Sequence, residues 1–330
     1  MEQSPNIDVK IGVVIIGRNE GERLLRCIAS AQHLSAHIVY VDSGSTDASV
    51  ASARRMGSLV VELDLSVPFT AARARNAGWR ELVRVHSEVE YVHFVDGDCE
   101  ILPSWVEQAQ RYFVGHSECA VVCGRRVERF PERSIYNTLC DIEWNTPIGE
   151  ALACGGDAII RREALAAMDG YRDDFIAGEE PELCVRLRHA GWKIQRIDVD
   201  MTLHDADMTK FIQWWKRTKR CGFAYALGAS VHGGPQERHW VKETLRATFW
   251  GGLLPLSIVI LSFFHVGFAL LFTVYPVQWL RVLRSAYFEQ DVKKQWAMFS
   301  ILGKFPEFMG VLEFYRKKIS NQKMTLIEYK

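Results

Sequence analysis

Two carboxylates separated by one glycine, Asp96-Gly97-Asp98, are the residues of this chain best suited to chemistry. They follow an apolar run, residues 91–95, which is rich in valine and aromatic residues and predicts a buried strand. In an open α/β sheet, ligands bind beyond the carboxyl ends of the strands. Two carboxylates there cost folding free energy unless a cation or hydrogen-bond donors meet them. The motif therefore indicates either an Asp-Gly turn or a site for a hard divalent ion that also binds substrate phosphates.

Polar residues also follow two other predicted strands. Asn19 and Glu20 come after the run 9–16, and Asp42 comes after the run 37–41. Because the carboxyl ends of neighbouring parallel strands lie side by side, these groups are expected to share one crevice with Asp98. A carboxylate such as Asp42 can accept from a base N–H, and a metal at Asp98 can bridge a diphosphate. The pattern therefore predicts a nucleotide site. The chain has neither GxGxxG after the first strand nor GxxxxGK[ST], which disfavours a dinucleotide cofactor and a P-loop.

Strands and helices alternate with short links up to Asp98, which predicts a mainly parallel sheet of the α/β class with right-handed crossovers. The expected strands are 9–16, 37–41, 58–63 and 91–95, and the expected helices are 22–32, 51–57 with Ser45 or Thr46 as its cap, and 70–85. Later the alternation loosens. The expected elements there are helices at 103–114, 162–168 and 181–190, strands at 120–127 and 193–197, and a glycine turn that runs into a strand within 154–161.

The composition narrows the class of protein. The 330 residues are enough for one large domain and an appendage, and Lys+Arg equals Asp+Glu at 40 each, so nucleic acid is not an expected partner. Eight cysteines occur without a CxxC pair, which is typical of reduced, packed cysteines. The N-terminus lacks an apolar signal core, so we expect the first domain on the cytoplasmic side of a membrane.

The C-terminal third has a different character. Aromatic and basic residues alternate in amphipathic helices expected over 209–246, and the stretch 247–280 then contains no Asp, Glu, Lys or Arg. As one helix it would be about 50 Å long, against a hydrocarbon core of ~30 Å. Basic residues flank it on both sides, which favours a membrane hairpin or broken span, the alternative being a buried soluble hairpin. We therefore divide the chain into a catalytic domain, 1–208, the segments 209–246 and 247–280, and an amphipathic cytoplasmic tail, 281–330.

In this order and at these spacings, the motifs resemble those of the family 2 glycosyltransferases of the membrane-associated bacterial type, with their nucleotide-diphospho-sugar (GT-A) fold. The resemblance covers roughly residues 9–225. It rests on the stretches 13–20, 41–47, 72–78, 96–98 and 178–187 and on Leu203-His204.

The resemblance implies a role for each matched residue. Asn19, Glu20 and Asp42 would hold the nucleoside, and Arg75 and Asn76 would brace its pocket. Asp96 would lie beside the ribose and the metal, and Asp98 would be the main protein ligand of Mg²⁺ or Mn²⁺. His204 matches a histidine that joins the metal or the diphosphate in some members of the family.

The general base must be a carboxylate that faces the acceptor. This chain has Glu179-Glu180 where the family usually has Glu-Asp, so we assign Glu180 as the base and Glu179 as the alternate, while an acidic first helix turn is the simpler explanation. Arg217 and Arg220 are candidates for the diphosphate or an anionic lipid head group, or for a basic face at the membrane surface. The processive Gln-x-x-Arg-Trp signature is absent at residues 213–217, which favours single addition.

The expected activity is metal-dependent, inverting transfer of one sugar from a nucleotide-diphospho-sugar, UDP being the favoured nucleotide. The expected acceptor is a hydroxyl of a lipid-linked saccharide or polysaccharide precursor at the membrane. Two alternatives stay open. One is a nucleotidyltransferase, which would require a glycine-rich phosphate loop after the first strand. The other is a sugar-nucleotide-binding membrane scaffold without turnover, which would need neither Glu180 nor Asp98.

Overall fold

The computed structural model of the protein describes residues 10–285 and 290–322 and divides into two compact units. The first unit contains the chain up to Pro131 together with Cys140–Asp207. The second contains Glu132–Leu139 and the chain from Met208 onward. A 3-10 turn, Pro131–Arg133, and helix α5, Ile135–Trp144, carry the chain across the boundary between the units.

The first unit is built on a nine-stranded sheet in the order β3-β2-β1-β4-β8-β6-β9-β5, with β7 beside β9. The first four strands, which are parallel, are β1 (Ile11–Gly17), β2 (Ile38–Asp42), β3 (Leu59–Glu62) and β4 (Tyr91–Asp96). The others are β5 (Cys99–Ile101), β6 (Cys119–Glu128), β7 (Gly149–Glu150), β8 (Ala158–Arg161) and β9 (Lys193–His204).

The first four strands are parallel, as expected, and beyond β4 the sheet is mixed. Strand β8 is antiparallel to β4 and β6, and β9 is parallel to β6 but antiparallel to β5 and β7. Strand β5 follows β4 after only Gly97 and Asp98, a link too short for a crossover helix, and β5 pairs with β9, not with β4.

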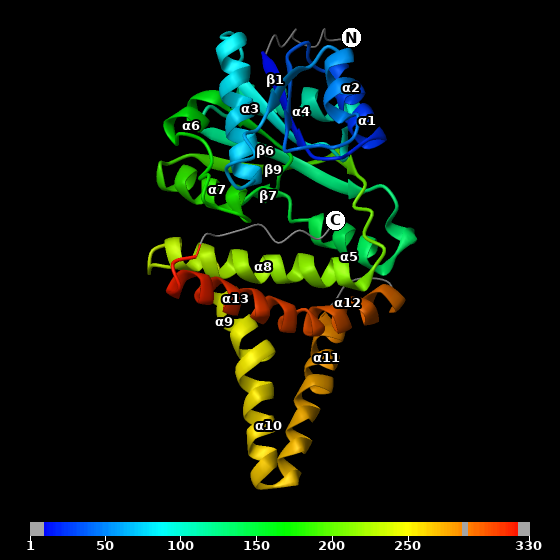
Figure 1. The fold of residues 1–330 in the computed structure, drawn as a ribbon, viewed down its shortest axis with the longest axis vertical. Helices are drawn as coiled ribbons and strands as arrows, with labels where there is room; N and C mark the ends of the chain where they lie inside the picture. Colours follow the sequence, from blue (N-terminus) through cyan, green and yellow to red (C-terminus); the bar gives the residue numbers. More distant parts are fainter. Residues whose placement is uncertain (1–9, 286–289, 323–330) are drawn as a thin grey trace. The chain divides into compact units, whose positions relative to one another are not determined.

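The sheet topology determines which helices cover each face. The connections from β1 to β2 and from β2 to β3 each place the next strand on the same side of the previous one in the sheet. The connection from β3 to β4 crosses back over β2 and β1 to the opposite side of β1. With right-handed crossovers, α1 (Glu22–Gln32) and α2 (Ser49–Arg55) must lie on one face and α3 (Ala71–Val85) on the other, as Figure 1 shows. The remaining helices of this unit are α4 (Pro103–Gly115), α6 (Arg162–Ala167) and α7 (Glu179–His189).

Helix α3 packs closely on β1 and β2 because of one glycine. A Cβ atom at Gly78 would collide with the side chains of Val14 and Val41, so only glycine allows this approach. The helix begins at a true cap, where the Thr70 hydroxyl accepts from the backbone N–H of Arg73 at 3.0 Å. This packing carries the residues of the second and third turns of α3 to the carboxyl ends of the strands.

Three sequence-based element limits are wrong. Helix α2 has Ala48 at its N-cap, because the Ser45 hydroxyl and the Thr46 backbone bond Asn19 instead. Helix α7 begins at Glu179, two residues earlier than predicted, after Gly178 at a left-handed φ of 79°. Strand β9 continues to His204, because its residues alternate between buried and exposed sides where the apolar run has already ended.

The second unit is helical. Its long helices α8 (Phe211–His232) and α13 (Lys304–Ile319) lie side by side (Figure 1). Gly222 and Gly310 make this possible, since a Cβ on either would overlap the backbone of the other helix. The rings of Phe223 and Phe314 meet edge to face at 5.5 Å between centroids. Helix α12 (Gln290–Leu302) precedes α13.

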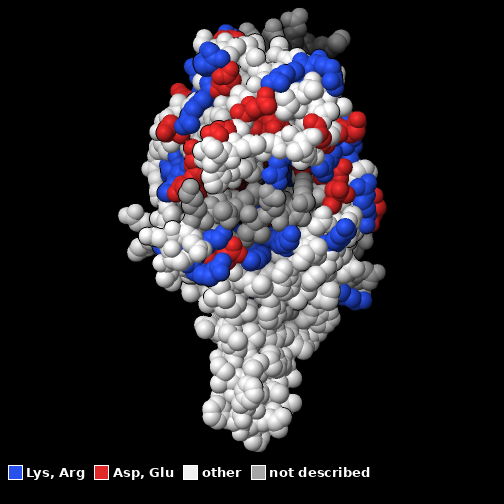
Figure 2. Space-filling view, viewed as in Figure 1, with Lys and Arg blue, Asp and Glu red and all other residues white. Residues whose placement is uncertain are grey.

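The apolar stretch 247–280 falls within two helical arms. The first runs from α9 (Val241–Thr248) through a π-helical turn, Phe249–Leu253, into α10 (Leu254–Phe264). The second runs through a 3-10 segment, Val266–Thr273, into α11 (Val274–Ser285). Their tip, around His265, is uncharged on its surface (Figure 2), and Phe263 there is 86% exposed. By length and composition each arm is a candidate membrane span, which weakly suggests membrane association.

Candidate active site

The carboxyl ends of β1, β2 and β4 lie together, as predicted. Gly17 pairs with Asp42 across β1 and β2, and Ile16 pairs with Asp96 across β1 and β4. The polar residues that follow each strand therefore occupy one edge of the sheet. A buried arginine from α3 organises this edge.

Arg75 joins two distant parts of the chain through one buried guanidinium group. Its Nη2 donates to Oδ1 of Asp96 at 2.9 Å, at the end of β4. Its Nη1 donates to Oε1 of Glu179 at 2.7 Å and lies 3.1 Å from Oε1 of Glu180, both in the first turn of α7. Removing one partner of a buried ion pair leaves an uncompensated charge. The network therefore holds the Asp96 carboxylate and the carboxylates of Glu179 and Glu180 in a defined geometry.

Asp96 is bonded on both of its carboxylate oxygens. Oδ1 accepts from Arg75, and Oδ2 accepts from Nη2 of Arg126 at 3.1 Å. Burial alone would raise the pKa of Asp96, but these two guanidinium groups hold it below its usual value. Arg126 also contacts Oδ1 of Asp157 at 2.8 Å, and Thr202 donates to the other oxygen of Asp157 at 2.6 Å. Asp96 is therefore an ionised carboxylate in a rigid frame.

Gly156 is the residue that allows the Arg75–Asp96 pair to form. A Cβ atom at this position would lie 2.5 Å from Nη2 of Arg75 and 3.0 Å from Oδ2 of Asp96. At the neighbouring Gly155, a Cβ would meet nothing within 4 Å. The close approach of the backbone at residue 156 therefore explains why this loop contains a glycine there.

Asp98, Cys99 and His204 form a buried group of potential metal ligands. Oδ1 of Asp98 lies 3.4 Å from Nε2 of His204, and the donor atoms of the three residues lie within 4.8 Å of one another. Burial raises the pKa of the Cys99 thiol well above its usual value, and a soft sulfur ligand suits ions such as Mn²⁺ or Mg²⁺ less well than oxygen does. The remaining carboxylate and imidazole donors fit a divalent ion such as Mn²⁺.

A second carboxylate orients the imidazole of His204. Its Nδ1 lies 3.4 Å from Oε2 of Glu128, and the ring of Trp144 meets it edge to face at 4.7 Å. Burial would lower the pKa of His204, but Asp98 and Glu128 raise it above the usual value. Carboxylates therefore flank the imidazole at both ring nitrogens, and a divalent cation held by Asp98 and His204 would add positive charge to this acidic group.

Glu179 and Glu180 have different surroundings although they are neighbours. The side chain of Glu179 is 4% exposed, and that of Glu180 is 14% exposed. Burial and the nearby Glu179 carboxylate raise the pKa of Glu180 to about 7, although Arg75 opposes the rise. A carboxylate that titrates near neutral pH and reaches solvent is suited to proton transfer.

The residues predicted to hold the nucleoside shape the loop that follows β2. Oδ2 of Asp42 accepts from the backbone N–H groups of residues 44 and 45 at 2.9 and 2.8 Å, and its Oδ1 accepts from the Tyr40 hydroxyl at 2.8 Å. Asn19, at a left-handed φ of 57°, accepts from the backbone N–H of Thr46 at 2.7 Å. Glu20 forms an ion pair with Arg23 at 2.7 Å. These contacts make the loop and the start of α1 one rigid surface.

Asn76 braces the segment 171–173. Its Nδ2 donates to the carbonyl of Tyr171 and to Oδ1 of Asp173, both at 2.7 Å. Its Oδ1 accepts from the backbone N–H of Tyr171 at 2.9 Å and from the Trp79 indole at 3.1 Å. Asn76 therefore fixes this segment, in which the Tyr171 ring lies 5.7 Å from the guanidinium group of Arg75.

Arg217 and Arg220 lie on α8 in the second unit, so their predicted contact with a diphosphate stays a prediction.

Sequence reasoning missed three residues of the first unit, Arg126, Glu128 and Asp157. Arg126 and Glu128 lie, with Arg125, in the charged second half of a strand that begins apolar, and Asp157 stands between a glycine pair and β8. Charged residues at such places were a usable signal, because they are costly to bury without partners.

Comparisons with known proteins agree with this architecture. Residues 12–167 match the model of the family described as glycosyl transferase family 2. No curated protein matches the chain. The mannosyltransferase PcManGT from Pyrobaculum calidifontis, in complex with GDP-Man and Mn²⁺, is similar with a TM-score of 0.54 and 17% identity, over 96% of this chain and 90% of that one. A mycobacterial protein is similar with a TM-score of 0.50 and 19% identity, over 69% of this chain and 76% of that one. At such identities these likenesses concern the fold, and they confirm the predicted fold class.

Proposed function

Because the chain is a family 2 glycosyltransferase, we propose that it transfers one sugar from a nucleotide-diphospho-sugar to an acceptor hydroxyl, with inversion at the anomeric carbon and Glu180 as general base. The observation that carries this proposal is the Arg75 network. It sets the two glutamates of α7 beside the end of β4, two residues from Asp98.

Glu180 supplies the base. In its ionised form it takes the proton of the acceptor hydroxyl while that oxygen forms a bond to the anomeric carbon. The bond from this carbon to the diphosphate oxygen breaks, and the nucleoside diphosphate leaves with the electron pair. A single displacement from the opposite face inverts the configuration. Glu179, which is bonded to Arg75, holds the network and keeps the pKa of Glu180 raised.

Asp98 and His204 would hold the metal ion, Mg²⁺ or Mn²⁺. When bound, the ion neutralises charge on the diphosphate of the donor and on the departing nucleotide. The similar fold of PcManGT, which was determined in complex with GDP-Man and Mn²⁺, supports a metal ion in the proposed reaction. Both oxygens of Asp96 are bonded to guanidinium groups, so we place Asp96 on the ribose side of the ion, not as its principal ligand.

Asn19, Glu20 and Asp42 would form the nucleoside side of the pocket, with UDP as our proposed nucleotide. The two apolar arms support a membrane-associated enzyme with a lipid-linked saccharide or polysaccharide precursor as acceptor. We place the catalytic unit on the cytoplasmic side and assign the basic face of α8, with Arg217 and Arg220, to the diphosphate or to anionic head groups.

Product analysis tests the proposal. The full chain in detergent is incubated with Mn²⁺ and UDP-, GDP- or dTDP-sugars, with and without extracted lipid-linked saccharides. We expect release of nucleoside diphosphate from one donor class, stimulated by acceptor and stopped by chelator. Release of pyrophosphate would indicate a nucleotidyltransferase, and donor binding without product would indicate a scaffold. Either result would overturn the proposed transfer.

A further inference from the structure

A second group of metal-ligating side chains lies at the opposite edge of the same sheet. His37 directly precedes β2, His86 is the C-cap residue of α3, and Glu88 lies in the turn before β4. These are the amino ends of the strands, whereas the candidate active site lies at their carboxyl ends. The proposed transfer reaction does not involve His37, His86 or Glu88.

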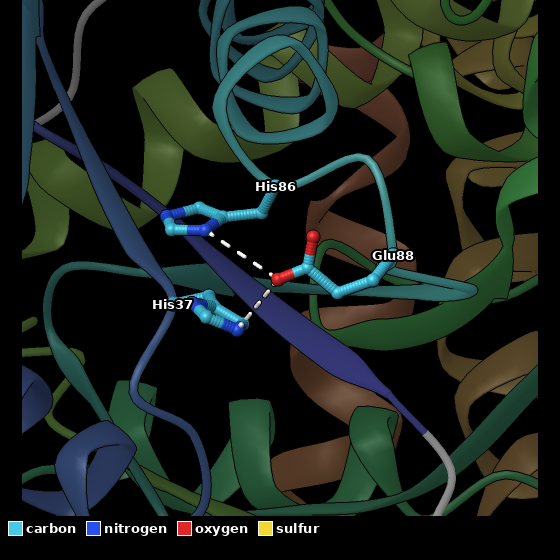
Figure 3. Close-up of side chains that lie close together, drawn as sticks. All are labelled: His37, His86 and Glu88. Carbon is cyan, nitrogen blue, oxygen red and sulfur yellow. Dashed lines mark ion pairs between the residues drawn. The ribbon is translucent and has the colours of Figure 1, made fainter.

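The three side chains converge on one point. Figure 3 shows the Glu88 carboxylate facing both imidazole rings. Oε1 of Glu88 lies 3.1 Å from Nε2 of His37 and 3.7 Å from Nδ1 of His86. The ligand atoms of the three residues lie within 4.8 Å of one another, and the two rings are 3.9 Å apart between centroids.

These distances fit a tetrahedral ion. Zn²⁺ binds imidazole nitrogen and carboxylate oxygen at about 2.0–2.2 Å, which in a tetrahedron separates ligand atoms by roughly 3.3–3.6 Å. The observed separations of 3.1 and 3.7 Å lie on either side of that range. The donor atoms of all three residues lie within 4.8 Å of one another, so closing the separation between the two imidazole nitrogens would complete the first three positions, and a water molecule would take the fourth.

Backbone hydrogen bonds hold the two histidines in place. The carbonyl of His37 accepts from Val13 of β1 at 2.9 Å, and its N–H donates to the Ser35 hydroxyl at 3.0 Å. The N–H of His86 donates to the carbonyl of Leu82 at 2.8 Å, and its carbonyl accepts from Val89 at 3.2 Å. Ligands that are already positioned lose little conformational entropy on binding, which favours affinity.

We propose that His37, His86 and Glu88 form a second metal site, which binds a borderline divalent transition ion such as Zn²⁺ and fastens the turn after α3 to the start of β2. Two imidazoles and one carboxylate favour Zn²⁺ over Mn²⁺ or Mg²⁺. The site is open to solvent, since the side chain of Glu88 is 39% exposed, so the ion can enter from bulk water. It differs from the Asp98 group in both place and preferred metal.

Calorimetric titration with Zn²⁺ tests this site. Every sample is the full chain with Asp98→Asn, because Zn²⁺ binds such ligands more tightly than Mn²⁺ and would displace it from the Asp98 group. The chain that is wild type at the proposed site is compared with His37→Gln, His86→Gln and Glu88→Gln. His33→Gln removes an exposed histidine at the end of α1 and serves as the matched control. We expect one Zn²⁺ per chain in wild type and in His33→Gln, and at least tenfold weaker binding in the other three variants.

Thermal unfolding gives an independent measurement. In the same Asp98→Asn background, Zn²⁺ should raise the Tm of wild type and of His33→Gln and leave that of His37→Gln unchanged, while all the metal-free proteins unfold at similar temperatures. Equal Zn²⁺ stoichiometry and affinity in wild type and in all three ligand variants would overturn the site. Neither measurement uses catalytic turnover, so the result is independent of the proposed transfer reaction.

Discussion

Replacing Arg75 by methionine tests the idea that one guanidinium group holds the candidate active site together. Methionine has a similar length and no charge, so the change removes the three carboxylate contacts of Arg75 while it fills much of the same volume. Asp96, Glu179 and Glu180 then face one another without the cation that separates them. The variant should be less stable and inactive.

The size of the effect follows from burial. Removing one partner of a buried ion pair costs about 3–5 kcal/mol. For a unit of this size, each 1 kcal/mol lowers the Tm by about 2–4 °C, so the expected loss is roughly 6–20 °C. Arg75→Lys keeps the charge but not the forked geometry and should lose less. Arg75→Met combined with Glu179→Gln should recover part of the loss, because one of the unpaired charges is gone.

The measurement is thermal unfolding of the full chain in detergent over a range of pH. Because the pKa of Asp96 is lowered in the folded state, Asp96 contributes stability above its unfolded pKa of about 3.9 that is lost as pH falls through the folded value. Arg75→Met should weaken this acid dependence. A Tm within 1 °C of wild type, or no recovery in the double variant, would refute the reasoning.

Three further predictions concern the same edge of the sheet. The pKa of Glu180, about 7, predicts that kcat/KM rises with pH through about 7. Because that pKa is raised in the folded state, the ionised carboxylate destabilises the fold at high pH. Glu180→Gln should therefore increase the Tm relative to wild type more at pH 8 than at pH 5. A flat profile between pH 6 and 8 would contradict the first part. Asp98→Asn should weaken Mn²⁺-dependent nucleotide binding at least tenfold. A nucleotide affinity of wild type that does not change when chelator is added would contradict the metal site. Gly156→Ala should lower turnover at least tenfold by displacing Arg75, whereas Gly155→Ala, with open space at its Cβ, should not; equal effects would refute the packing argument.

Much of the first unit could be predicted from sequence because its signals are local. β-branched runs indicate β1, β2 and β4, and the predicted limits of the helix at 22–32 agree with α1. The adjacency of Asp42 and Asp96 follows from the rule that parallel strand ends lie together, and the strand register confirms it.

The rest depends on contacts between distant residues. Nothing near Arg126 in sequence shows that it bonds Asp96 and Asp157, which lie 30 and 31 residues away. Asp198 and Asp200 end the apolar run in β9, so the sequence predicts only its first half, although the strand continues with those side chains on its exposed side. The cluster of His37, His86 and Glu88, the proposed second metal site, likewise forms only when the strand order brings these turns together.

The most direct test of the central claim compares turnover and donor binding in Glu180→Gln. Glutamine keeps the size of the side chain and its reach but cannot accept the proton. Glu163→Gln, on an exposed surface of the same unit, is the matched control. With the donor identified by product analysis, we expect Glu180→Gln to lose at least a hundredfold in kcat while its donor Kd stays within about threefold of wild type. Turnover equal to that of Glu163→Gln would contradict the assignment of Glu180 as the base.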